Sequence, residues 1–234
     1  MRLICLQHVW YDDAGFLEEW VKVWGCSLHY FDAKKPVNYP ELEDEDVLVV
    51  LGGPMSVLDL PDTEWMQKEV AYIEKALQHG HKVIGICLGS QLLAHIYGTE
   101  VHTLPKYEMG WAEINWDHGF LEDFDVEDMD IPMFHWHSDL YELPEGTKPL
   151  GKTDLTPVQG FYTDQVLAFQ FHPEMTVKGI QQLIDHDHQE IELRDTSVEI
   201  EEPRADPGYV EQSHNRFQPI LEKFLGVSGE KKID

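Results

Sequence analysis

The chain of 234 residues is poor in positive charge, in cysteine and in long apolar segments. It has 17 Lys and Arg against 44 Asp and Glu, so its formal net charge is −27. A surface this acidic repels phosphate backbones and anionic lipids, which argues against nucleic acids and membrane surfaces as partners. No apolar run is long enough to span a bilayer, and the first ten residues lack the apolar core of a signal peptide.

The three cysteines are Cys5, Cys26 and Cys87. An odd number without framework spacing argues against a disulfide scaffold and is typical of a reducing cytoplasm, where we expect the protein to be located. Cys5 lies inside a predicted strand and Cys26 lies beside a glycine, so both are expected to be structural. Cys87 lies between two glycines and has a different context.

The sequence around Cys87 predicts a strand, a sharp turn and a helix over residues 82–97. The apolar run 83–86 is typical of a strand buried on both faces, and an apolar-periodic segment follows. A thiol at such a turn is held out from the sheet edge, and the helix N-terminus favours the thiolate. The N–H of Leu88 would be free to hold an oxyanion. The alternative is that Cys87 is a small buried core residue.

A nucleophilic thiol needs a base, and His172 is the candidate. Residues 166–171 predict another buried strand, and His172 follows directly at its end. Glu174, two residues later, is placed to orient the imidazole. The alternatives are a surface histidine that caps a strand and a solvated acid near a helix start.

Three motifs in this order resemble the class I, or triad, glutamine amidotransferases: the glycine pair Gly52-Gly53 after a buried strand, GICLGSQ around Cys87, and FHPE at 171–174. The resemblance implies that Cys87 is the nucleophile, His172 the general base and acid, and Glu174 the orienting carboxylate. It covers most of the chain.

The resemblance also implies a substrate site. The N–H groups of Gly53 and Leu88 would form the oxyanion hole. The substrate-binding residues it implies are Gly52, Gln91, Ser138 and Asp139.

His135 and His137 offer a competing interpretation of the segment that contains Ser138 and Asp139. They share one face of a predicted strand, a spacing that can bind a metal, and residues 185–188 offer further ligands. We expect no metal site and no cofactor here, and we expect His186 and His188 to be exposed on a polar helix.

Strands and helices alternate through Tyr97, which predicts a parallel sheet. Strands are expected at 3–7, 27–31 and 47–51, and helices at 13–24 and 62–79, the second with Asp62 as its N-cap. After Gly98, short strands are expected at 111–116, 133–137, 158–162 and 166–171, some of them antiparallel, with an acidic loop or helix face at 121–130.

We therefore expect one α/β domain over residues 1–234, with an open, doubly wound, mostly parallel sheet, helices on both faces in a flavodoxin-like three-layer arrangement, and a smaller antiparallel region. A helix from Thr176, an acidic stretch through Glu202 and a helical extension at 203–234 are expected to form an outer layer.

The activity implied by the resemblance is hydrolysis of the γ-amide of glutamine through a γ-glutamyl thioester, with release of ammonia and glutamate. The sequence shows no P-loop and no pattern for a second catalytic domain, so the expected ammonia acceptor is a separate synthase subunit. Two alternatives stay open: a γ-glutamyl peptidase or hydrolase that uses the same triad, and a non-catalytic binding or regulatory module on the same fold.

Overall fold

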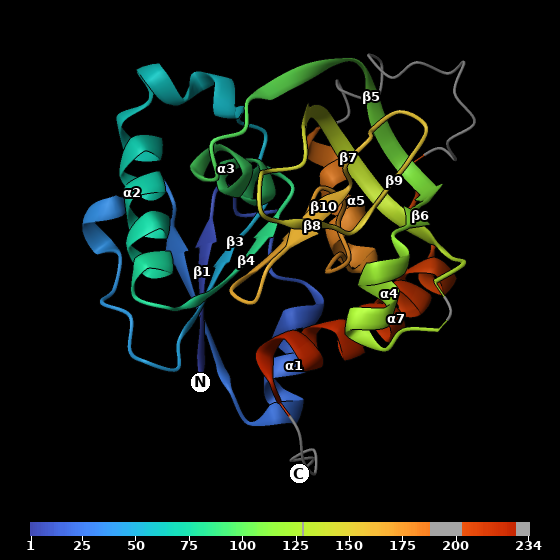
Figure 1. The fold of residues 1–234 in the computed structure, drawn as a ribbon, viewed down its shortest axis with the longest axis horizontal. Helices are drawn as coiled ribbons and strands as arrows, with labels where there is room; N and C mark the ends of the chain where they lie inside the picture. The colour runs from blue at the N-terminus through green and yellow to red at the C-terminus, as the bar shows by residue number, and fades with distance from the viewer. Residues whose placement is uncertain (128, 188–202, 228–234) are drawn as a thin grey trace.

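An open sheet of seven strands lies at the centre of the computed structural model, which describes residues 1–127, 129–187 and 203–227 (Figure 1). The strand order is β2-β1-β3-β4-β11-β10-β8. The pairs from β2 to β11 are all parallel, whereas β10 runs antiparallel to both of its neighbours. The strands are β1 (Arg2–Gln7), β2 (Ser27–Asp32), β3 (Val47–Val50), β4 (Lys82–Ile86), β8 (Lys148–Pro149), β10 (Gly160–Tyr162) and β11 (Val166–Phe169).

Helices cover both faces of this sheet, which confirms the predicted doubly wound, three-layer α/β fold (Figure 1). One face packs against α2 (Glu64–Gln78) and α3 (Leu88–Ile96) through a core that includes Val50 of the sheet. The other packs against α1 (Phe16–Trp24), α4 (His118–Phe124) and α7 (Pro207–Leu225). Strands β3 and β4 are buried on both sides, which is why they are continuous apolar runs rather than alternating ones.

A separate antiparallel pair lies above the carboxyl ends of the central strands. It consists of β5 (Val101–Glu113) and β7 (Pro132–Tyr141), which pack through Trp111 and Phe134 against α5 (Val177–His186). A third, two-stranded sheet joins β6 (Asn115–Trp116) to β9 (Gly151–Lys152). The predicted antiparallel region is therefore present, and β5 begins ten residues before the strand expected at 111–116.

Several predicted boundaries were wrong by a few residues. The helix expected from Asp62 begins at Glu64 with Thr63 at its N-cap, because Pro61 and Asp62 belong to the 3-10 helix η2 (Val57–Asp62). The helix expected over 13–24 begins at Phe16, and the strand expected over 166–171 ends at Phe169.

Residues 118–124 of the acidic region form α4, and a short 3-10 helix, η1, spans Pro36–Asn38. The acidic stretch that was predicted to end at Glu202 lies outside the described residues from 188 onward. Within the described ranges, no helix is both long and apolar enough to cross a bilayer.

Candidate active site

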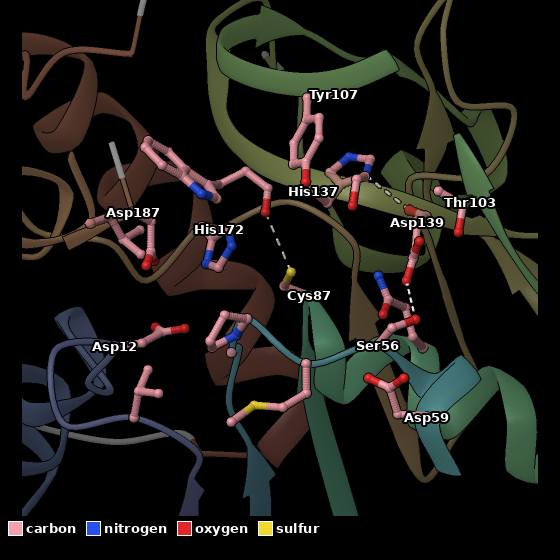
Figure 2. A pocket seen from close by; sticks show the side chains of 18 of the residues that line it. Asp12, Ser56, Asp59, Cys87, Thr103, Tyr107, His137, Asp139, His172 and Asp187 are labelled. Atoms are coloured by element: carbon pink, nitrogen blue, oxygen red, sulfur yellow. Dashed lines mark hydrogen bonds between the residues drawn. The ribbon is translucent and has the colours of Figure 1, made fainter. Parts of the chain in front are cut away.

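The predicted catalytic residues lie at the ends of three neighbouring strands. Gly52 and Gly53 follow β3, Cys87 follows β4, and His172 comes after β11, which pairs with β4. Because the carboxyl ends of parallel strands meet at one edge of the sheet, these residues converge on one crevice. The crevice is a pocket of about 310 Å³, and Figure 2 shows Cys87 between His172 on one side and Asp139 on the other.

Cys87 occupies the N-cap of α3 with φ 50° and ψ −107°, a conformation that costs a non-glycine residue energy. The N–H of Cys87 donates to the carbonyl oxygen of Phe169 at 2.8 Å, which ties the turn to the neighbouring strand. The thiol reaches the pocket and donates to the carbonyl oxygen of Trp136 at 3.6 Å. Cys5 contrasts with it, since Cys5 is fully buried and burial raises its pKa strongly.

Two glycines allow α3 to approach the sheet closely. A Cβ atom on Gly89 would lie 2.0 Å from the carbonyl oxygen of Val50, and one on Gly85 would lie 2.5 Å from Cδ1 of Leu93. Because Gly85 and Gly89 have no side chains, the start of α3 can lie close to β3 and β4, and this short distance determines the position of the thiol.

His172 and Glu174 form a buried acid–base pair. Nδ1 of His172 lies 2.8 Å from Oε1 of Glu174, and both side chains are almost completely inaccessible. Burial lowers the pKa of His172, but the charge of Glu174 and the contacts with Glu174 and Cys87 outweigh it, so the pKa lies well above its usual value. Nε2 has no hydrogen-bond partner among the described residues, which leaves it available on the Cys87 side.

The two predicted oxyanion donors come from the segment after β3 and from the start of α3. Gly53 lines the pocket, and Leu88 begins α3, so the N–H of Leu88 has no intrahelical acceptor. Gly52 was predicted to contact the substrate, but it does not line the pocket: a Cβ there would lie 2.4 Å from Oδ2 of Asp12 and 3.1 Å from Cε1 of His172.

The predicted substrate-binding residues Gln91, Ser138 and Asp139 all line the pocket. Asp139 is held by the hydroxyl of Ser56, which donates to its Oδ2 at 2.6 Å, and both lie on the side of Cys87 away from Asp12 (Figure 2). The amide of Gln91 contacts Oε1 of Gln170 at 3.4 Å.

Three polar residues near the site did not follow from the motifs: His8, Asp12 and Glu69. His8 and Asp12 come just after β1, so the rule that located the other site residues at strand ends would have located them too. Glu69 lies on the buried face of α2 with Met66 and Ile73, where a carboxylate interrupts an apolar stripe. A charged residue at such a position signals a buried partner.

The alternative metal site also has a structural counterpart, because Glu108, His135 and His137 are buried close together. However, the carboxylate of Glu108 already accepts hydrogen bonds from side chains of the neighbouring loop and lies 3.1 Å from Nε2 of His137. The loop donors are Thr153, Thr156 and Gln159.

Burial lowers the pKa of His135 to about 4, so its ring is neutral at physiological pH. The hydrogen bonds of Glu108 connect β5, β7 and the loop, whereas neither ring nitrogen of His135 has a hydrogen-bond partner among the described residues. Asp185 and His186 are exposed residues of α5, and His188 lies outside the described residues.

Comparison with known proteins agrees with the geometry. The family model described as glutamine amidotransferase class-I matches residues 17–187. The glutamine amidotransferase-like protein YfeJ of Salmonella typhimurium is 31% identical over 204 residues, which cover 82% of this chain and 83% of YfeJ. A subunit of the glutamine-hydrolyzing GMP synthase of Sulfurisphaera tokodaii is 31% identical over 168 residues, covering 69% of this chain and 84% of that protein.

The fold is also found in a solved structure. The crystal structure of a glutamine amidotransferase from Thermotoga maritima superposes with a TM-score of 0.80 at 24% identity, covering 96% of this chain and 98% of that one.

Proposed function

Since the chain belongs to the class I glutamine amidotransferase family, we propose that it hydrolyses the γ-amide of glutamine through Cys87, His172 and Glu174. One observation carries the proposal: a thiol at a strained helix N-cap lies beside an imidazole whose far nitrogen is held by a buried carboxylate at 2.8 Å. A thiol, an imidazole and a carboxylate in this order support a mechanism of acyl transfer with a nucleophile, a base and an orienting group.

In this mechanism His172 takes the thiol proton and Cys87 attacks the side-chain carbonyl carbon of glutamine. The carbonyl oxygen becomes an oxyanion held by the N–H groups of Gly53 and Leu88. His172 then returns the proton to the leaving nitrogen, so that ammonia departs and a γ-glutamyl thioester remains. A water molecule, deprotonated by His172, cleaves the thioester and yields glutamate and the free thiol.

The glutamyl part of the substrate would lie on the side of Cys87 that holds Asp139, and Gln91 and Ser138 also line the pocket. A carboxylate such as that of Asp139 is suited to pair with the α-ammonium group of the substrate. For the released ammonia, the likeness to the GMP synthase protein of Sulfurisphaera tokodaii supports a separate synthase as the acceptor.

A second candidate function is hydrolysis of γ-glutamyl peptides by the same triad. The pocket continues past His172 to Asp12 and Asp187, on the side opposite Asp139 (Figure 2). The hydroxyl of Tyr11, which also lines the pocket, donates to Oδ1 of Asp187 at 3.0 Å. Space on both sides of the thiol suits a substrate whose leaving group is an amine larger than ammonia.

The test is glutamate release by the purified protein from glutamine, from γ-glutamyl dipeptides and from glutathione, with Cys87→Ala as the control. We expect release from glutamine that Cys87→Ala abolishes. Release only from the peptides would favour the second candidate. If no substrate is cleaved and a glutamine-like electrophile leaves Cys87 unlabelled, the proposal is wrong and a binding module is favoured.

A further inference from the structure

His8 and Glu69 form a second buried acid–base pair, which contacts the Gly52–Gly53 segment through the carbonyl oxygen of Gly52. Nε2 of His8 lies 3.1 Å from Oε1 and 3.2 Å from Oε2 of Glu69, and the two side chains are essentially inaccessible. Nδ1 of His8 lies 3.0 Å from the carbonyl oxygen of Gly52. Burying a carboxylate is costly unless it is paired, so a pair with no role in the proton transfers above calls for an explanation.

The hydrogen bond from His8 shows how the peptide between Gly52 and Gly53 is oriented. A trans peptide unit is planar, and its C=O and N–H groups point in opposite directions. With the Gly52 oxygen directed at His8, the N–H of Gly53 points away from His8. His8 packs on one side of Gly53, where a Cβ would lie 2.7 Å from Cβ of His8, and Gly53 also lines the pocket. Among the described residues this N–H has no acceptor.

We propose that His8, held in place by Glu69, is a positioning residue that keeps the Gly52–Gly53 peptide turned so that the N–H of Gly53 points at the forming oxyanion. The inference rests on the proposed function, because the oxyanion exists only in that reaction. His8 itself lies outside the segment 17–187 that the family model matches.

The peptide between two glycines needs a hydrogen bond of this kind, because nothing in the glycines themselves opposes its rotation. Without Cβ atoms, two successive glycines reach several backbone conformations at similar energy. A half-turn of the peptide would replace the donor with a carbonyl oxygen, which repels an oxyanion. Oxyanion stabilisation depends on donors that are already oriented before the reaction starts, so a fixed peptide contributes directly to the rate.

A protonated His8 forms a stronger hydrogen bond with the carbonyl oxygen of Gly52 than a neutral His8 does. Both ring nitrogens face acceptors, and only the imidazolium form donates to both. Burial lowers the pKa of His8, but the charge and hydrogen bond of Glu69 and the contact with Gly52 outweigh it, so the pKa lies above its usual value. A charge-assisted hydrogen bond holds the Gly52 carbonyl more firmly than a neutral one.

The experiment compares two replacements of His8 in a Glu69→Gln background, so that no variant buries an unpaired carboxylate. In His8→Asn, the side-chain amide nitrogen takes the place of Nδ1 and still donates to the carbonyl oxygen of Gly52. In His8→Gln, the side-chain amide nitrogen takes the place of Nε2, so the hydrogen bond to Gly52 is lost. We expect Glu69→Gln with His8→Asn to keep kcat within about threefold of Glu69→Gln alone, whereas Glu69→Gln with His8→Gln lowers kcat roughly 10- to 100-fold below that reference. Removal of a complete oxyanion donor would lower kcat more.

Two further readouts separate positioning from general damage. KM for the γ-glutamyl substrate and the rate of Cys87 alkylation by iodoacetamide, which needs no oxyanion hole, are expected to stay within about twofold of wild type in the His8→Gln variant. Its crystal structure should show the Gly52 carbonyl turned toward the pocket. An unchanged kcat, or an unchanged peptide in that crystal structure, overturns the inference. If wild type cleaves no γ-glutamyl compound, the proposed function fails, and the peptide orientation still decides the role of His8.

Discussion

Asp12 is a carboxyl group in the wall of the pocket that works against the stability of the fold. The residue is 2% exposed, and its Oδ1 has no hydrogen-bond partner among the described residues. Burial raises the pKa of Asp12 from 3.8 to about 7, although the charge of His172 lowers it in part. Polar groups kept at such a cost are typical of functional sites.

The raised pKa makes stability depend on pH. Between pH 3.8 and about 7 the folded protein holds a proton on Asp12 that the unfolded chain has lost, so stability falls as the pH rises through this window. At about 1.36 kcal/mol per pH unit, the difference corresponds to about 4 kcal/mol at pH 8. We expect Asp12→Asn to raise the free energy of unfolding by about 2 to 4 kcal/mol at pH 8 and by little at pH 4.

Chemical denaturation at the two pH values measures this difference. The exposed carboxylate of Asp59, which also lines the pocket, supplies the matched control, and Asp59→Asn should change stability little at either pH. An Asp12→Asn variant that is less stable than wild type at pH 8 would show that the buried carboxylate makes a favourable contact, which contradicts the destabilising role given to it here.

At the scale of the elements, the position of α3 depends on its first turn. Ala at position 89 would put its Cβ 2.0 Å from the backbone oxygen of Val50, so the helix start must lift away from β3. We expect Gly89→Ala to cost about 3 kcal/mol or more, because overpacking against a backbone atom cannot be relieved by a rotamer change. The lifted turn also displaces Cys87 and the N–H of Leu88, so activity falls with stability.

Gly179, in the first turn of α5, is the control for the same substitution. Its nearest neighbours are Sδ of Met175 at 3.0 Å, which belongs to a flexible side chain, and Oγ1 of Thr176 at 3.4 Å. Gly179→Ala should change stability by no more than about 1 kcal/mol, since Ala is the better helix former. Equal losses in the two variants, measured by urea denaturation, would mean that the close approach of α3 to β3 is not the cause.

The sequence predicted the central strands and helices well, but it did not predict the buried polar residues that support the site. β3 and β4 are buried on both faces, and such strands are recognisable as apolar runs followed by glycine or a polar residue. The position of Cys87 at the start of α3 and the pairing of His172 with Glu174 followed from the motifs. The pairing of His8 with Glu69 did not, because contacts between a strand end and a helix 61 residues later depend on packing that local patterns do not encode. The start of α2 was misplaced because Pro61 and Asp62 close a 3-10 helix.

At the scale of the whole molecule, charge dominates the approach of small molecules to the pocket. The chain carries a net charge of −27, and four aspartates, at positions 12, 59, 139 and 187, line the pocket, whereas no Lys or Arg does so among the described residues. When the side chains that line a cleft all carry charge of one sign, the electrostatic field is concentrated inside the cleft. An anion should therefore reach Cys87 more slowly than a neutral molecule of the same size.

Salt should remove much of this barrier, because the Debye length falls from about 30 Å at 0.01 M to about 8 Å at 0.15 M. We expect the rate of Cys87 alkylation by the anion iodoacetate to rise severalfold over this range, while the rate for neutral iodoacetamide stays within about twofold. The assay uses a Cys26→Ser background, because Cys26 is partly exposed whereas Cys5 is fully buried. Asp59→Asn removes one pocket charge and should weaken the salt dependence. If the iodoacetate rate instead falls with salt, the positive charge of a protonated His172 outweighs the acidic walls, and anionic γ-glutamyl compounds such as glutathione would then be attracted to the pocket rather than repelled.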